Sequence, residues 1–337
     1  MSTVKERVFH CINVEQFDYA FLEEICDLAD KIREISRTKA GMEYLASTLN
    51  HKRAMLYFVQ PSTRTFLSFY SACQMLGIKC AEVRDPKTSS EIKGESEEDT
   101  VRTFSLYFDL IIMRHPRANF AEKIAYLLNK TDHPVPVINA GSGKDQHPTQ
   151  ALLDIYTLRR SFMHRGGVAQ KKIAFVGDLR RGRTVRSLAK LLTQFEEMKL
   201  YFVAPAEYQI GEDIIAFLEQ NKTEYEITDD FEKVVPEVDA IYMTRLQDEW
   251  DQEEGGHVDI DIERYSFQRR HLDLLKPDGI IMHPLPRRTE IAAEVDGDPR
   301  AAYWRQVRNG MYIRVALIAG IFQRDRKILE YYLSNNL

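Results

Sequence analysis

The chain has 337 residues and a formal net charge of -5, from 46 lysines and arginines against 51 aspartates and glutamates. Hydrophobic residues make up 44% and charged residues 29%, a composition typical of globular proteins and not of disordered chains, coiled coils or collagen. The length favours two domains, because a single hydrophobic core stops growing near ~250–300 residues. The slight acidic excess argues against a nucleic-acid-binding protein, which usually carries a basic excess.

Neither a membrane span nor a secretory signal is expected from the sequence. The apolar run Val315–Phe322 is far shorter than the ~20 residues that cross a bilayer. Residues Met1–Gln16 lack the apolar core of a signal peptide. The four cysteines form no CxxC pair and no cysteine–histidine metal spacing. We therefore expect a cytoplasmic protein with reduced cysteines, no bound metal and no membrane partner.

Segments typical of strands and of helices alternate along the chain. Apolar runs and helical periodicity predict, in chain order, helix 18–35, strand 53–59, helix 63–76, strands 78–83 and 109–113, helix 119–129, strand 135–139 and helix 148–161. The alternation resumes with strand 172–176, helix 184–195, strand 200–203, helix 212–221, strands 240–243 and 279–282, and helices 303–322 and 327–333. Short apolar strands joined through helices predict an α/β fold of two domains, each a mostly parallel sheet with helices on both faces.

The restart of this alternation indicates a domain boundary at the start of helix 148–161. We expect a first domain over residues 1–147 and a second over residues 148–302. The last helices have no strand after them, and we expect residues 303–337 to pack back on the first domain. The composition of the polar run Arg84–Thr100 is typical of a solvated loop.

The segment Gln60–Thr65 directly follows the first predicted strand. Ser62 or Thr63 can cap the next helix, and Pro61 fits near a helix start. A helix N-terminus offers free N–H groups and a partial positive charge. Three hydroxyls and the Arg64 guanidinium at that point predict a phosphate-binding site, and a plain capped helix is the alternative.

Two further polar segments follow strands, where open α/β sheets bind ligands. Arg114-His115-Pro116 follows the third strand, and a glycine-rich segment that begins at Ala140 leads through His147 into a helix. The second segment resembles a P-loop only superficially, because Lys144 is followed by an aspartate. A lone histidine usually has a structural role, but His147 lies at a strand-to-helix junction as Arg64 does, which makes it a candidate site residue.

The second half of the chain carries further motifs at strand ends. Gly177–Thr184 has the spacing of a Walker A loop, with Arg183 in place of the lysine. A nucleotide site is one interpretation, weakened because that motif uses the compact lysine ammonium, and a basic surface turn is another. Thr244–Gln247 offers Arg245 to an anion, and the prolines of His283–Arg287 fix the backbone there.

Taken together, these motifs resemble the carbamoyltransferases, and the aspartate branch of that family in particular. The matching segments are, in order, Pro61–Thr65, Met113–Pro116, His147–Gln150, Gly177–Leu179 with Gly182–Thr184, Thr244–Gln247 and His283–Arg287. Members of the ornithine branch usually have a cysteine motif and a serine-methionine-glycine loop in place of the last two segments. In addition, Arg245 would repel the amine of ornithine, whereas it would attract a carboxylate of aspartate.

The resemblance implies transfer of the carbamoyl group of carbamoyl phosphate to the amine of L-aspartate. The products would be N-carbamoyl-L-aspartate and phosphate, in an early step of pyrimidine biosynthesis, with no cofactor. The implied catalytic residues are Arg64, Thr65, Lys93, Arg114 and His147. Carbamoyl phosphate would be bound, mainly by the first domain, through Ser62, Thr63, Arg64, Thr65, Arg114, His147, Gln150 and the carbonyls of Leu285 and Pro286. Aspartate would be bound, mainly by the second domain, through Ser89, Lys93, Arg183, Arg245 and Gln247.

The resemblance also implies an assembly. Ser89 and Lys93 match loop residues that reach the active site of the neighbouring subunit, so the chain would work as a homotrimer with shared sites, and a regulatory chain is a further candidate partner. The chain departs from the family at Gln60 and Trp250, commonly a Glu and an Arg that hold the domains closed. Alternatives therefore stay open: a carbamoyltransferase for another amino acid, or a non-catalytic member that binds carbamoyl phosphate or acts as a scaffold.

Overall fold

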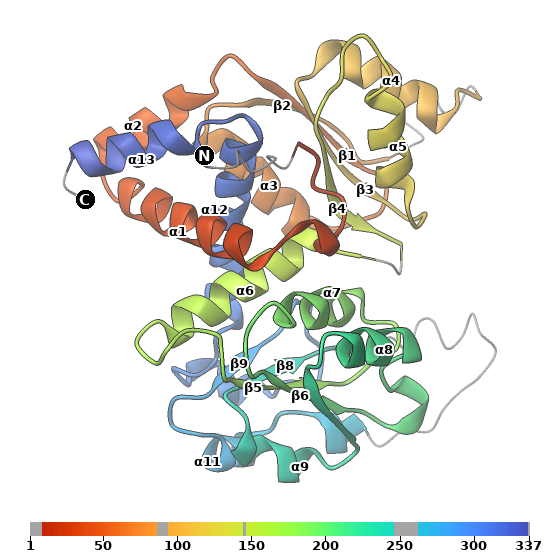
Figure 1. Cartoon of the computed structure of the whole chain (residues 1–337), viewed down its shortest axis with the longest axis vertical. Coiled ribbons are helices and arrows are strands. Elements are labelled where there is room, and N and C mark those ends of the chain that lie inside the picture. The colour runs from red at the N-terminus through yellow and green to blue at the C-terminus, as the bar shows by residue number, and fades with distance from the viewer. Residues whose placement is uncertain (1–8, 86–93, 144–145, 246–261, 336–337) are drawn as a thin grey trace. The chain divides into compact units, whose positions relative to one another are not determined.

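A computed structural model describes residues 9–85, 94–143, 146–245 and 262–335 (Figure 1). The strands are β1 Arg53–Phe58, β2 Lys79–Val83, β3 Leu110–His115, β4 Val137–Ser142, β5 Lys172–Val176, β6 Lys199–Val203, β7 Glu224–Thr228, β8 Ala240–Met243 and β9 Ile280–Met282. The α-helices are α1 Tyr19–Ile35, α2 Lys39–Thr48, α3 Thr63–Met75, α4 Glu97–Tyr107, α5 Phe120–Leu128, α6 Pro148–Phe162, α7 Arg183–Leu192, α8 Glu212–Gln220, α9 Phe231–Val234, α11 Arg269–Leu274, α12 Tyr303–Ile321 and α13 Asp325–Ser334. Short 3-10 helices are Val14–Gln16, Ala206–Tyr208, Val235–Glu237, Ile262–Tyr265 and Ala293–Gly297.

The chain divides into two compact units, each built on one sheet. Unit 1 comprises Met1–Leu152 and Arg308–Leu337, and unit 2 comprises Leu153–Val307. The sheet of unit 1 has the strand order β2-β1-β3-β4, and that of unit 2 has the order β7-β6-β5-β8-β9. Every pair of neighbouring strands in these sheets is parallel. The predicted α/β class with two parallel sheets is therefore confirmed.

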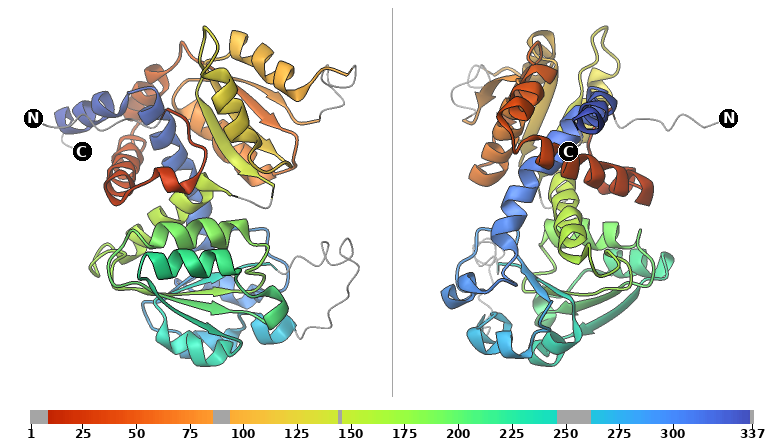
Figure 2. Two further views of the ribbon diagram at one scale, coloured as in Figure 1. Left: turned by 45° about the vertical axis from the view of Figure 1, so that its right-hand side comes forward. Right: turned by 90° about the vertical axis from the view of Figure 1, so that its left-hand side faces the viewer.

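In unit 1 the two faces of the sheet are covered by different helices (Figures 1 and 2). Met55 and Tyr57 of β1 belong to a buried cluster with residues of α4 and α5 such as Val101 and Ile124. Alternate residues along a strand point to opposite faces, so the buried Leu56 lies on the other face, the one that carries α3. Both faces are buried, which explains why β1 is apolar throughout.

The C-terminal helices return to unit 1. α13 packs on α1 and α2, where the rings of Tyr44 and Tyr331 stack 3.7 Å apart and the Tyr44 hydroxyl donates to the carbonyl of Lys327. Arg33 of α1 also donates a hydrogen bond to Asn309 of α12. Helices α12 and α13, from the end of the chain, thus pack against helices from its beginning. Within the described residues, no helix is both long and apolar enough to cross a membrane.

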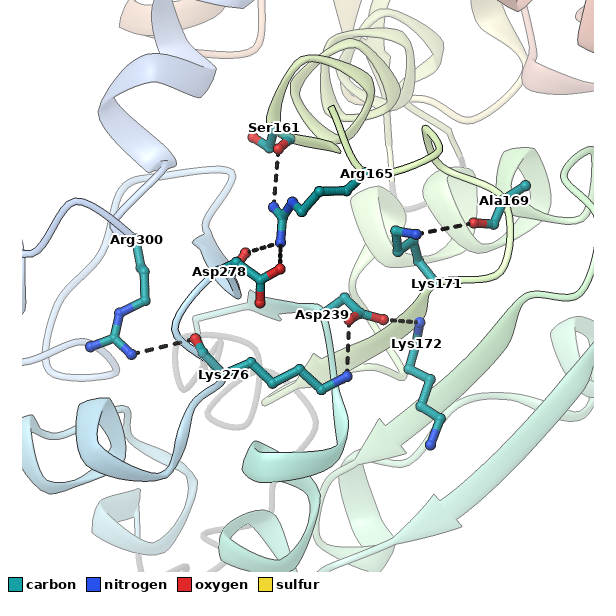
Figure 3. A network of polar contacts seen from close by, with 9 residues as sticks. All are labelled: Ser161, Arg165, Ala169, Lys171, Lys172, Asp239, Lys276, Asp278 and Arg300. Atoms are coloured by element: carbon teal, nitrogen blue, oxygen red, sulfur yellow. Dashed lines mark hydrogen bonds and ion pairs between the residues drawn. The ribbon is translucent and has the colours of Figure 1, made fainter. Parts of the chain in front are cut away.

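Unit 2 repeats the arrangement around a larger sheet. One face carries a buried cluster that joins Val176 and Met243 to Phe231 of α9 and Leu272 of α11, and α7 and α8 lie on the other face (Figure 1). Hydrogen bonds and ion pairs of charged side chains connect the amino ends of its strands (Figure 3). There Asp239 accepts from the backbone N–H of Lys172 at 2.8 Å and from Lys276 at 2.9 Å. Arg165 pairs with Asp278. Ligands of open α/β sheets bind at the opposite, carboxyl ends of the strands.

Several elements differ from the sequence predictions. Residues 97–100 of the expected loop Arg84–Thr100 form the first turn of α4, capped by Ser96, whose Oγ accepts from the N–H of Asp99 at 3.1 Å. Strand β4 continues through the glycine-rich segment to Ser142. Helix α2 and edge strand β7 were not predicted. β7 is only partly buried along its length, so its alternating sequence Glu-Tyr-Glu-Ile-Thr lacks the apolar run used to find the buried strands.

Asp154 on α6 is the buried centre of a polar network in unit 2. Its two carboxylate oxygens accept from the Tyr242 hydroxyl at 2.8 Å and from Gln306 Nε2 at 2.6 Å. Asp154→Ala would leave both donors buried without this acceptor, and we expect it to lower the free energy of unfolding by roughly 2–4 kcal/mol. Asp154→Asn can accept from Gln306 and donate to Tyr242, so its loss should be less than half as large. Urea unfolding of both variants checks this, and equal losses would contradict it.

Candidate active site

The polar segments singled out in the first half of the sequence all follow neighbouring strands of unit 1. Gln60–Thr65 follows β1, Arg114–Pro116 spans the end of β3, and Gln146 and His147 come shortly after β4. Because these strands are parallel and adjacent, the three segments lie along one edge of the sheet. The N–H of Gln60 donates to the carbonyl of Arg114 at 3.3 Å, which joins the first two segments directly.

The N-terminus of α3 presents backbone donors at this edge. Ser62 is extended (φ -163°) and its carbonyl accepts from the N–H of Phe66, so the helix starts at Thr63. Among the described residues, Ser62 Oγ accepts no capping hydrogen bond from a backbone N–H of α3, so the expectation that this side chain caps the helix is wrong. The hydroxyl and the first N–H groups of α3 are the kind of donor set that binds phosphate. Thr65 is buried and Arg64 is exposed.

Arg114 and His147 meet over one glycine. Gly141 has φ +117°, and a Cβ built there would lie 2.6 Å from Arg114 Nη1 and 3.4 Å from His147 Cδ2. Only glycine therefore lets both side chains come this close to β4. Arg114 Nη1 also donates to the carbonyl of Ala140 at 3.2 Å. A buried guanidinium and a buried imidazole held side by side can polarise a carbonyl and stabilise an anion.

Arg314 links the two helices that carry this site. It is buried on α12, and its guanidinium donates to Ser68 Oγ of α3 at 2.7 Å and to Thr149 Oγ1 of α6 at 3.4 Å. Ser68 follows Thr65 by one turn, and Thr149 lies between His147 and Gln150. No local sequence pattern identifies Arg314 as a site residue, because it is an arginine within an apolar helix far from the motifs along the chain.

Unit 2 shows the same organisation. Gly177–Arg183 follows β5, Thr244–Arg245 follows β8 and His283–Arg287 follows β9, and these strands are neighbours in the sheet. Gly177 is again the point of close approach, since at φ +115° a Cβ would lie 2.4 Å from the carbonyl oxygen of Thr244. Thr244 is fixed further by its N–H and its Oγ1, which both donate to the carbonyl of Val176 at 2.8 and 2.9 Å.

Arg183 is the first residue of α7, at the end of the Gly177 loop. Burial lowers the pKa of its guanidinium to about 10, so it remains a cation at neutral pH. A half-buried cation at a helix N-terminus is suited to binding an anion. The buried Asp178 carboxylate lies inside the same loop and accepts from the N–H of Arg181 at 3.0 Å. A carboxylate there disfavours nucleotide phosphates, unlike a Walker A loop.

The last segment is a tight loop from His283 to Glu290. Leu285 has φ +55° and its peptide bond to Pro286 is cis. Arg287 is held by ion pairing with Asp296 and by the Tyr303 hydroxyl. Of the remaining predicted site residues, Ser89, Lys93 and Gln247 lie outside the described residues, as do Lys144 and Trp250.

Comparison with known proteins bears on the identity of this arrangement. Residues 10–160 match the family model described as aspartate/ornithine carbamoyltransferase, carbamoyl-P binding domain, and residues 169–321 match its Asp/Orn binding domain. The chain belongs to the aspartate/ornithine carbamoyltransferase family. The resemblance found in the sequence is thereby confirmed.

Individual relatives fall in the aspartate branch. The chain is 41% identical to the chloroplastic aspartate carbamoyltransferase of Arabidopsis thaliana, covering 91% of this chain and 76% of the relative. It is 39% identical to the aspartate carbamoyltransferase catalytic subunit of Clostridium novyi, covering 92% and 96%. Among solved structures, the catalytic subunit of M. jannaschii aspartate transcarbamoylase superposes with a TM-score of 0.82 at 36% identity, covering 94% and 98%. A Trypanosoma cruzi aspartate transcarbamoylase in complex with carbamoyl aspartate and phosphate gives a TM-score of 0.80 at 33% identity, covering 92% and 94%.

Proposed function

We propose that this chain transfers the carbamoyl group of carbamoyl phosphate to the α-amine of L-aspartate, an early step of pyrimidine biosynthesis. The proposal rests on the candidate site residues that lie at the carboxyl ends of the strands in both units of a chain from this family. Unit 1 offers the N-terminus of α3 with Arg114 and His147, and unit 2 offers arginines that follow its strands. Related structures from Trypanosoma cruzi hold carbamoyl phosphate, or carbamoyl aspartate with phosphate.

Unit 1 supplies the groups for carbamoyl phosphate in this proposal. Ser62, Thr63, Arg64 and Thr65 bind the phosphate at the start of α3, and Arg114 adds a second guanidinium. Thr65, Arg114 and His147 donate to the carbamoyl oxygen and stabilise the negative charge that develops there. Gln150, with the carbonyls of Leu285 and Pro286 from unit 2, accepts from the carbamoyl amino group. The supporting evidence is the burial of Thr65, Arg114, His147 and Gln150, and the close approach of Arg114 and His147 to Gly141.

Aspartate carries two carboxylates, and unit 2 offers arginines to match. Arg183 and Arg245 bind the carboxylates, with Gln247 assisting and with Ser89 and Lys93 contributed by a neighbouring chain. The α-amine then attacks the carbamoyl carbon, a C–N bond forms, and the tetrahedral intermediate expels phosphate as the C–O bond breaks. The departing phosphate accepts the amine proton, so positioning and electrostatic stabilisation supply most of the catalysis and no separate base is required.

We also propose a cytoplasmic homotrimer with active sites shared between chains, and a regulatory chain as a candidate partner. Sharing predicts that two inactive variants rescue each other when mixed. In this proposal, Lys93→Ala removes a side chain that contributes to the active site of the neighbouring chain, whereas Arg114→Ala removes a side chain of the chain's own active site. Mixed trimers of the two should contain some intact sites and regain a fraction of the wild-type activity, with a trimeric mass by light scattering. No recovery after mixing and refolding would contradict shared sites.

Gly177 offers a prediction with a matched control. Gly177→Ala and Gly166→Ala both place a side chain at positive φ, +115° and +80°, but only the first meets an atom within 4 Å, the Thr244 carbonyl oxygen. We expect Gly177→Ala to displace Thr244 and Arg245 and to raise the KM for aspartate at least tenfold, while the KM for carbamoyl phosphate stays within about threefold. Gly166→Ala should cost only about 1 kcal/mol of stability. Steady-state kinetics of both variants decide it, and equal KM values for aspartate would contradict it.

The direct test of the proposal is product formation. The full chain, incubated with carbamoyl phosphate and L-aspartate, should release phosphate and form carbamoyl aspartate in equal amounts, identified by mass. Phosphate release without the carbamoylated product would indicate hydrolysis only. Binding of carbamoyl phosphate with no turnover on any amine would favour the non-catalytic alternative.

A further inference from the structure

The loop His283–Glu290 of unit 2 is closed by its own two end side chains. The N–H of Leu285 donates to His283 Nδ1 at 2.7 Å. His283 Nε2 lies 2.8 Å from Glu290 Oε1, and the N–H of Arg288 donates to Glu290 Oε2 at 2.9 Å. Both His283 and Glu290 are buried, at 1% and 5% exposure. The loop is therefore fixed from inside by a histidine and a carboxylate.

These contacts determine the protonation state of the imidazole. A nitrogen that accepts from a backbone N–H carries no proton, so Nδ1 is the acceptor and Nε2 carries the hydrogen that it donates to Glu290. Protonation of Nδ1 would break the bond from Leu285. Burial acts to raise the pKa of Glu290, but the hydrogen bond from His283 and backbone N–H donors hold that pKa below its ordinary value. The pair is thus a neutral histidine oriented by a carboxylate.

The pair restrains the residues whose carbonyls carry the proposed recognition. Leu285 has φ +55°, a conformation that residues other than glycine adopt only when their surroundings hold them there. The bond from its N–H to His283 is one such restraint. The base of the loop is anchored too, because the N–H of His283 donates to Gln306 Oε1 at 2.9 Å, and Gln306 is bonded to the buried Asp154.

We propose that His283 and Glu290 are positioning residues that hold the carbonyls of Leu285 and Pro286 as acceptors for the carbamoyl amino group, and that they thereby set the preference for carbamoyl phosphate over acyl phosphates that lack N–H donors. This rests on the proposed function. Neither side chain needs to touch the substrate. A carbonyl displaced by less than 1 Å loses most of a hydrogen bond. A rigid loop therefore favours a substrate whose N–H groups can donate to these carbonyls.

Glu290→Gln is the sharpest variant. Glutamine has the same shape but only one acceptor oxygen, so it cannot accept from both His283 Nε2 and the N–H of Arg288. Acetyl phosphate replaces the amino group of carbamoyl phosphate with a methyl group and serves as the probe. We expect Glu290→Gln to reduce the ratio of kcat/KM for carbamoyl phosphate over acetyl phosphate about tenfold, with inorganic phosphate binding within twofold of wild type. The exposed Glu294→Gln is the matched control and should leave the ratio unchanged.

His283→Asn separates the two bonds of the imidazole. An asparagine oxygen can take the place of Nδ1 and accept from Leu285, whereas nothing then donates to Glu290 in the place of Nε2. We expect the ratio to fall less than in Glu290→Gln, and adding Glu290→Gln to His283→Asn to change it by less than threefold, because the two residues act as one unit. Independent, multiplying effects would contradict the pairing.

The tautomer can be observed without turnover. In 15N spectra of the full chain, the signal lost on His283→Asn should be that of a neutral imidazole with hydrogen on Nε2 at pH 7. The opposite tautomer, or an imidazolium, would overturn the assignment. An unchanged selectivity ratio in Glu290→Gln, on wild type that forms carbamoyl aspartate, would overturn the positioning role alone. A wild type without carbamoyl transfer would instead overturn the proposed function, and the NMR result would still stand or fall separately.

Discussion

Arg114→Ala is expected to lower kcat/KM for carbamoyl phosphate roughly 10³-fold. The guanidinium is buried over Gly141 beside His147, where the dielectric is low and a charged donor to the phosphate and the carbonyl oxygen is worth most. Since the contact to the carbonyl oxygen strengthens as charge develops, most of the loss should appear in kcat. Initial-rate kinetics at saturating aspartate measure it.

Arg117→Ala is the control for charge and proximity. Arg117 lies three residues further along, pairs with Glu97 and covers the ring of Phe120, and it is exposed. Its replacement should leave kcat within about twofold. Arg114→Lys keeps the charge but not the planar pair of donors, and should recover only a small part of the activity. Near-normal kinetics in Arg114→Ala would remove this residue from the mechanism.

Arg183→Ala is expected to raise the KM for aspartate about 10²-fold, with a much smaller effect on the KM for carbamoyl phosphate. The burial that lowers the pKa of Arg183 to about 10 also makes its pairing with a carboxylate strong, because little water competes. The affinity for succinate, which has both carboxylates and no amine, should fall by the same factor. Competitive inhibition by succinate therefore separates a binding role from a chemical one.

Arg180→Ala tests the same loop at an exposed position, whereas Arg183 is half-buried. Arg180 is exposed, and its backbone N–H, which alanine retains, donates to the carbonyl of Tyr208. It should leave the affinity for succinate unchanged. A similar loss in both variants would mean that the loop acts through its net charge, and an unchanged succinate affinity in Arg183→Ala would place the dicarboxylate elsewhere.

Local patterns in the sequence were sufficient for the family and for the fold class. The strands buried on both faces, such as β1 and β5, read as uninterrupted apolar runs, and the polar segments just after them carry the family motifs. Parallel order makes such segments share an edge, so sequence position alone implies proximity within each sheet. The roles of the individual site residues stay predictions.

The parts that could not be predicted depend on contacts distant in sequence. α4 begins inside a highly charged run, and it is held by a Ser96 cap and by packing of residues such as Val101 on the sheet. His115 belongs to one of the family motifs, but its Nε2 lies 3.1 Å from Oε1 of Glu97 in α4. Arg314 and Glu290 act through partners that no local pattern identifies. Local sequence patterns therefore do not identify polar side chains that become buried only through tertiary structure.

Competition between two amine acceptors tests the proposed function most directly. With carbamoyl phosphate limiting and L-aspartate and L-ornithine present at equal concentration, the product ratio equals the ratio of their kcat/KM values. The arginines at the strand ends of unit 2 predict carbamoyl aspartate in at least hundredfold excess, and the preference should largely disappear in Arg183→Ala. Citrulline as the main product, or no carbamoylated amine at all, would contradict the assignment of this chain as a carbamoyltransferase for aspartate.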